Sequence, residues 1–155
     1  MPARIFVFLH IATMFAAVAV AIGSWLILRR IGRSGDVPAI RGTFASGASL
    51  TRLVPILYGL GAALGIVAIF TNDFDPFQPF LLIAYGLFIL ATVVGAVVIE
   101  PWLKRVTQAA AESPDAAPSA ELAALLGDPK ARVIDWLDPL IILLFVFDMV
   151  VKPFA

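Results

Sequence analysis

Four long apolar runs, separated by polar connections, dominate the pattern of hydrophobic and polar positions along the chain. They cover residues 5–28, 53–70, 79–99 and 134–151. A helix of about 20 mostly apolar residues crosses the hydrocarbon core of a bilayer, and its backbone groups are paired within the helix itself. The pattern therefore predicts an all-α, polytopic membrane protein, with residues 1–155 forming a single bundle of four transmembrane helices.

The arginines and lysines are distributed unevenly between the connections, which predicts the orientation of the chain. Residues 29–52 hold five arginines and residues 100–133 hold four basic residues, whereas only Arg4 and Lys152 lie elsewhere. Connections rich in basic residues remain in the cytoplasm. We therefore expect a protein of the cell (inner) membrane with cytoplasmic loops 29–52 and 100–133 and with both termini outside the cytoplasm.

The two cytoplasmic connections differ in the structure that they predict. Residues 31–49 include Gly35, Pro38, Gly42 and Gly47, which favour a loop and break any long helix. Residues 102–112 are expected to continue the third helix beyond the membrane, and residues 121–126 to form a short surface helix.

Small residues recur at a spacing of four in three of the runs, which places each set on one helical face. The pairs are Gly61 and Gly65, Ala91 and Gly95, Ala19 and Gly23, and Ala12 and Ala16. In lipid, helices associate where small residues let their backbones approach closely. These faces predict packing within the bundle or homodimerisation. The fourth run is bulky over residues 140–147 and is expected to face lipid or a partner subunit.

The composition indicates that lipid surrounds much of the chain, and it excludes nucleic-acid binding and cysteine chemistry. Hydrophobic residues make up 61% of the chain and charged residues 14%, against about 25% charged in ordinary soluble domains. The formal net charge is zero, so the basic field that nucleic-acid binding requires is missing. The chain has no cysteine, which excludes disulfides and thiolate metal ligands.

Three polar residues within the apolar runs are predicted to share one layer of the outer leaflet. At a rise of about 1.5 Å per residue, His10 lies about 8 Å and Asp148 about 5 Å from the outer surface, and Tyr85 lies at a comparable depth. Ionisable residues inside a membrane are functional candidates. His10 either bonds to Asp148, Tyr85 or a carbonyl and joins helices, with Asp148 the expected partner, or acts as an axial heme ligand through its neutral imidazole.

Other chemistry is not indicated by the sequence. His10 is the only histidine, and no cluster of histidines and carboxylates has the spacing of a metal site. Ser24 has no histidine near its depth that would activate it. We therefore expect no enzymatic activity.

Four short segments resemble those of a known family. They are Phe8-Leu9-His10, Arg52-Leu53-Val54, Val-Ile-Glu-Pro-Trp-Leu-Lys-Arg at 98–105 and Met-Val-Val-Lys-Pro at 149–153. The pattern resembles small bacterial four-helix membrane proteins known only as a domain of unknown function. That family is distantly similar to copper-resistance D membrane proteins and to the four-helix protoporphyrinogen oxidase of bacterial heme synthesis. The oxidase resemblance implies that His10 matches its heme-associated first-helix histidine, although Pro79-Phe80-Leu81-Leu82 replaces its Trp…Lys-Leu pattern.

These observations lead to one expected function and two alternatives. We expect a structural or accessory component of a membrane assembly, whose partners are membrane lipid and either other membrane subunits or a second copy. The first alternative is a redox protein that binds a b-type heme through His10. The second is a bundle that binds a lipid or a quinone near Tyr85.

Overall fold

The computed structural model describes residues 2–153, and all regular structure in this part of the chain is helical. The elements are α1 (Pro2–Gly32), α2 (Val37–Thr71), α3 (Pro79–Val94), the π-helical turn η1 (Gly95–Ile99), α4 (Glu100–Glu112), α5 (Ala120–Gly127) and α6 (Pro129–Val151). The predicted all-α class is confirmed. Each of the four apolar runs lies within these helices, the third one across α3 and η1.

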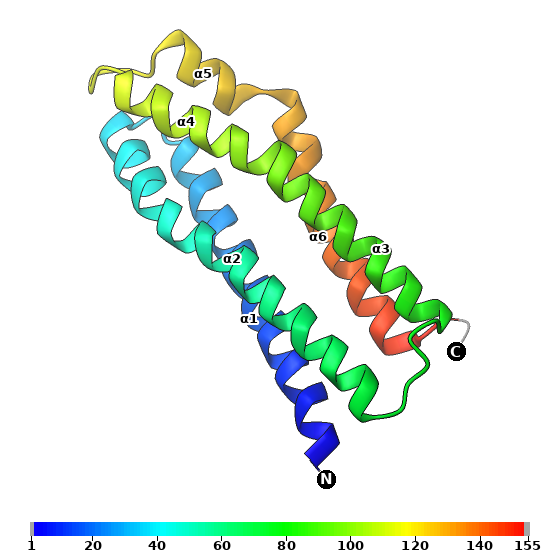
Figure 1. Cartoon of the computed structure of the whole chain (residues 1–155). Helices are drawn as coiled ribbons and strands as arrows, with labels where there is room; N and C mark the ends of the chain where they lie inside the picture. Colours follow the sequence, from blue (N-terminus) through cyan, green and yellow to red (C-terminus); the bar gives the residue numbers. More distant parts are fainter. Residues whose placement is uncertain (1, 154–155) are drawn as a thin grey trace.

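The long helices form two antiparallel pairs (Figure 1). Helix α1 packs along α2, and α3 packs along α6. Helix α4 continues from α3 through η1 and contacts α2, while α5 packs on α4. The pairs also meet where the rings of Tyr58 on α2 and Phe88 on α3 lie 6.5 Å apart.

Three helical segments among the described residues are long and apolar enough to cross a membrane. They are Arg4–Gly32, Val37–Thr71 and Pro79–Glu112, whereas α6 is apolar over the shorter stretch Pro139–Val151. Large apolar side chains point outward on all four long helices, among them Phe15 (72% exposed), Ile56 (63%), Ile89 (62%) and Leu143 (63%). Three helices, and part of α6, thus present the surface that lipid requires. Residues 154 and 155 lie outside the described residues, so the side predicted for the C-terminus stays a prediction.

The first connection corrects the sequence prediction, because most of residues 29–52 are helical. Only a short turn separates α1 from α2, and Gly35 supplies its positive φ of 73°. The side chain of Asp36 then caps α2 by accepting a hydrogen bond of 3.0 Å from the backbone N–H of Ala39. Pro38 lies in the first turn of the helix, where its missing N–H costs nothing. Proline and aspartate therefore start this helix.

Two of the expected helix breakers, Gly42 and Gly47, lie inside α2. Gly47 is buried against α1, and a Cβ atom at this position would lie 3.3 Å from Cδ2 of Leu28. The cost of a glycine in a helix is about 1 kcal/mol, and the contact of Gly47 with Leu28 and the burial of Ile40 and Phe44 on either side of the exposed Gly42 outweigh it. Tertiary packing therefore carries α2 through both glycines.

The second connection follows the prediction. Helix α4 extends the third helix to Glu112, and α5 covers the predicted residues 121–126. Between α3 and α4, the N–H of Glu100 bonds to the carbonyl of Gly95, five residues back instead of four. Pro101 accounts for this π turn, because its ring has no N–H and displaces the carbonyl four residues before it.

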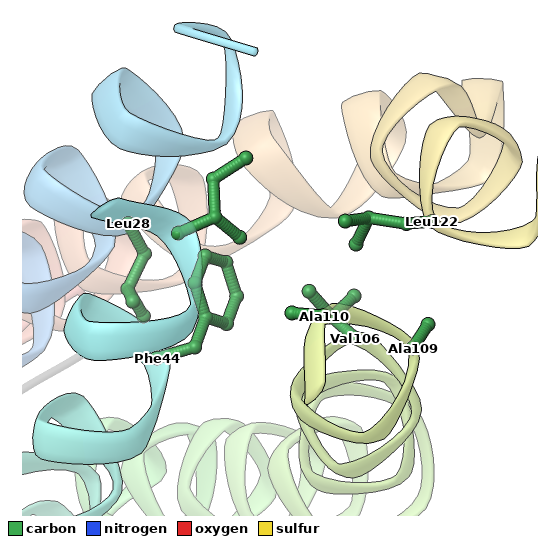
Figure 2. Close-up of a cluster of buried hydrophobic side chains, with 7 residues drawn as sticks. Leu28, Phe44, Val106, Ala109, Ala110 and Leu122 are labelled. Atoms are coloured by element: carbon green, nitrogen blue, oxygen red, sulfur yellow. The ribbon is translucent and has the colours of Figure 1, made fainter. Parts of the chain in front are cut away.

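The best-packed region lies where α1, α2, α4 and α5 meet. Its buried apolar residues, called the junction cluster below, are Leu28, Ile40, Phe44, Val106, Ala109, Ala110 and Leu122. Figure 2 shows side chains from these helices converging on this centre. Trp102 packs at its edge: its ring meets Phe44 edge-on with centroids 6.3 Å apart, and its N–H donates to the carbonyl of Leu125 over 3.2 Å. The junction cluster fixes one end of the α1–α2 pair against α4 and α5.

Arg41 adds a polar connection between α2 and the end of α4. Its guanidinium donates to the carbonyls of Ala110 (3.1 Å) and Ser113 (2.8 Å) and to the carboxylate of Asp115 (2.9 Å). The last carbonyls of a helix have no partner within the helix, and the negative end of its dipole favours a cation. Arg41 thereby satisfies two of these carbonyls from a neighbouring helix.

Candidate functional site

His10 on α1 is bound to α2 by a side-chain hydrogen bond. Its Nδ1 lies 2.7 Å from the carbonyl oxygen of Gly61. A carbonyl only accepts hydrogen bonds, so the bond requires the proton on Nδ1. In the neutral imidazole, Nε2 then keeps its lone pair. The partner of His10 is thus a carbonyl, one of the acceptors considered, and not the expected Asp148.

Gly61 and Gly65 form the surface of α2 on which this histidine lies. A Cβ atom at Gly65 would lie 2.9 Å from Nδ1 and 3.0 Å from Cε1 of His10, and one at Gly61 would lie 2.5 Å from Sδ of Met14. All three distances are too short for ordinary contact between nonbonded atoms. The two glycines therefore create the space that the side chains of α1 occupy.

The remaining small residues of the predicted packing faces are not at such close contacts. A Cβ atom at Gly23 or Gly95 would meet nothing within 4 Å. Ala19 is exposed, and Ala91 is half-buried. Among the described residues, the small faces of α1 and of the α3–η1 helix are thus left open, whereas that of α2 is filled by α1.

Asp148 lies in a different place, between α6 and α3. Its side chain is 2% exposed, and neither carboxylate oxygen has a hydrogen-bond partner among the described residues. It lines a pocket of about 200 Å³ together with Ile83, Leu87, Leu144, Phe147 and Pro153. Apart from this carboxylate, the lining side chains are apolar.

The side chain of Lys152, four residues after Asp148, points toward two aromatic rings and not toward the carboxylate of Asp148. Its ammonium group lies 5.6 Å from the ring centre of Phe74 and 5.4 Å from that of Phe80. Such distances are typical of cation–π contacts. The backbone N–H of Lys152 bonds to the backbone carbonyl of Asp148 over 2.9 Å, so the two residues are joined through the main chain alone.

The predicted outer polar layer is therefore not assembled as one site. His10 lies on the α1–α2 contact and Asp148 on the α3–α6 contact. Tyr85 on α3 is 38% exposed and does not line the pocket of Asp148. No hydrogen bond in the described part of the chain joins any two of the three.

Sequence reasoning missed the acceptor of His10 because depth alone does not say which way a side chain points around its helix. One signal was available: Gly61 and Gly65 were identified as a close-packing face, and a small-residue face must receive side chains from its neighbour. The short turn between α1 and α2 makes these helices neighbours. The turn alone does not give their register, since it would place His10 opposite Gly59, whereas the contacts of Leu28 with Gly47 and of Met14 with Gly61 belong to the register that places His10 opposite Gly65.

The arrangement offers two chemical capacities. At His10, an imidazole oriented by a carbonyl presents Nε2 as a base or a ligand. At Asp148, a buried carboxyl without a hydrogen-bond partner among the described residues borders an apolar pocket. Within residues 2–153, no group of three or more histidine, aspartate or glutamate side chains is placed to hold a metal ion. Comparison with protein-family models, with curated proteins and with solved structures found no match.

Proposed function

We propose that this chain is an integral protein of the cell membrane that serves as a structural or accessory component of a membrane assembly. The observation that carries the proposal is the open small-residue face of α1 around Ala19 and Gly23: Ala19 is exposed, and a Cβ atom at Gly23 would meet no described residue within 4 Å, although the face suits close helix contact. The corresponding face of α2, at Gly61 and Gly65, is already covered by side chains of α1. The open face is therefore left for a helix from a second copy or from another subunit.

The packing of the chain supports such a role. The junction cluster and Arg41 hold one end of the molecule, while large apolar side chains point outward along the apolar lengths of the helices. Hydrophobicity by itself does not join helices in lipid, so specific association depends on close-fitting faces of this kind. The proposed orientation, with loops 29–52 and 100–133 in the cytoplasm, rests on their basic residues.

The test is purification of the tagged chain from its native membrane in a mild detergent, with and without cross-linking. We expect a complex larger than a monomer. Gly23→Leu should break up that complex while leaving the thermal stability of the chain itself unchanged, because no described residue lies within 4 Å of the position of the new Cβ atom. Gly59→Leu is the matched control, since Gly59 also borders open space but lies on another helix. A monomer under all conditions would refute the assembly role.

A second candidate is a heme-binding redox protein, and the His10–Gly61 hydrogen bond is the observation that favours it. A histidine that donates from Nδ1 to a carbonyl leaves Nε2 for a metal, which is the usual arrangement in ligating histidines. His10 would supply one axial bond, while Met14 is directed at Gly61 and serves packing. A bound heme would supply one-electron redox chemistry. The resemblance to the heme-pathway oxidase points the same way.

The absorption spectrum of the purified protein separates the two candidates. A heme-free protein shows no Soret band at any stage of purification. A stoichiometric Soret band that disappears in His10→Ala and is retained in Tyr85→Phe would establish the heme protein instead. We favour the accessory role, because His10 is the only histidine of the chain, so that a second imidazole ligand would have to come from another molecule.

A further inference from the structure

We propose that the pocket between α3 and α6 binds a hydrophobic ammonium compound, whose cationic head pairs with Asp148 and whose apolar chain lies along the pocket wall. The site is distinct from the open face of α1 and from His10. Its ligand class follows from the charge and position of Asp148, from the lining of the pocket, and from its size.

Within residues 2–153, no described group is a hydrogen-bond partner of the buried carboxyl group of Asp148. Asp148 is 2% exposed, and neither of its carboxylate oxygens has a hydrogen-bond partner among the described residues. A buried polar group without a hydrogen bond costs stability, and a buried charge costs far more unless it is paired. Asp148 is one of the residues that line a pocket between α3 and α6, and its two oxygens lie just beneath the apolar surface of that pocket. A ligand in that pocket can therefore provide the missing hydrogen-bond donors.

No described basic side chain forms an ion pair with Asp148. Lys152 is close in sequence, but its ammonium group lies over the rings of Phe74 and Phe80. The acidic residues of the nearby turn, Asp73 and Asp75, add negative charge at the same end of the molecule. An external cation is therefore the complementary partner.

The lining of the pocket defines the rest of the ligand. Ile83, Leu87 and Leu144 offer aliphatic contact, and the aromatic ring of Phe147 is a further acceptor for a cation. Sites for drug-sized ligands usually enclose about 300–1,000 Å³, whereas this pocket has about 200 Å³. The volume suits a slender alkyl chain and not the fused rings of a quinone or a heme. A primary alkylammonium satisfies both requirements.

The test uses the full chain in lipid nanodiscs and octylammonium as the probe, with octanol as the uncharged analogue. Equilibrium dialysis against empty nanodiscs measures the binding that depends on the protein. We expect saturable binding of octylammonium, weakened about tenfold or more in Asp148→Asn, because a charge-assisted hydrogen bond is lost. Octanol should bind weakly and equally to both proteins.

A pair of adjacent substitutions tests whether the pocket itself is the site. Leu144→Trp fills the pocket and should abolish saturable binding, whereas Leu143→Trp places the same ring on the outward face and should not. Asp148→Asn keeps the size of the side chain, so it stays informative if Leu144→Trp fails to fold.

Two results would overturn the proposal. Equal affinity of octylammonium for the wild-type protein and Asp148→Asn would show apolar partitioning alone. Tighter binding of the ketone 2-nonanone than of octylammonium, lost in Asp148→Asn, would show that the carboxyl is a protonated donor to a carbonyl ligand.

Discussion

A single methyl group added at Gly65 tests the contact between α1 and α2. In Gly65→Ala the new Cβ would lie 2.9 Å from Nδ1 and 3.0 Å from Cε1 of His10. The ring cannot move aside freely, because its Nδ1 is bonded to the carbonyl of Gly61 over 2.7 Å. The substitution must therefore either separate the helices or break that hydrogen bond.

The matched control is Gly59→Ala, on the same helix but next to open space. Alanine is favoured over glycine in a helix by about 1 kcal/mol at both positions, so this gain cancels in the comparison. Overpacking costs about 1–3 kcal/mol, and an interhelical hydrogen bond in a membrane contributes about 0.6 kcal/mol. We expect Gly65→Ala to be about 2–3 kcal/mol less stable than Gly59→Ala.

The assay is reversible unfolding of the purified protein in mixed micelles with increasing dodecyl sulfate, followed by far-ultraviolet circular dichroism. His10→Ala is introduced in both backgrounds to complete a double-mutant cycle. Without the ring, Gly65→Ala should become as harmless as Gly59→Ala, so the coupling energy between His10→Ala and Gly65→Ala should equal the whole difference of about 2–3 kcal/mol. Equal stability of Gly65→Ala and Gly59→Ala, or a coupling energy near zero, would refute this account of the contact.

Two further predictions concern the contact of Arg41 with the end of α4 and the proposed orientation. Arg41→Lys should destabilise the chain by about 1–3 kcal/mol in the same assay, because an ammonium cannot serve three acceptors in the planar arrangement of a guanidinium. Asp115→Asn should cost less than about 1 kcal/mol, since that carboxylate is exposed. In intact cells, an impermeant maleimide should label Asp75→Cys but not Ser46→Cys, and the reverse pattern would invert the proposed topology.

The helices themselves were largely predictable from the sequence. Apolar length identified all four runs, and the polar stretch after Glu112 marked the end of α4. The beginning of α2 was missed because Gly42 and Gly47 were weighed as isolated breakers. Their effect on helix propensity is small next to the burial of Ile40 and Phe44 in the junction cluster.

The candidate sites were predictable as residues but not as contacts. His10 and Asp148 stood out because ionisable groups are rare in apolar runs. Their depth along the membrane normal was calculable from the helical rise, whereas the direction of each side chain around its helix depends on which helices are neighbours. Because α1 pairs with α2 and α3 pairs with α6, His10 lies in the first of these helix contacts and Asp148 in the second. A pattern within one run carries no information on that pairing.

The π turn at η1 has a consequence for how the two ends of the molecule are related. One extra residue in a helical turn rotates everything after it by about 100° around the helix axis. Helix α3 can thus direct one face toward α6. Helix α4, which continues the same helix beyond the π turn, places Val106 and Ala110 in the junction cluster. Pro101 thereby sets which face of α4 points toward the junction cluster, independently of which face of α3 points toward α6. Deleting one residue at Val97 or Val98 would leave both helices intact and turn the contact face of α4 away from α2.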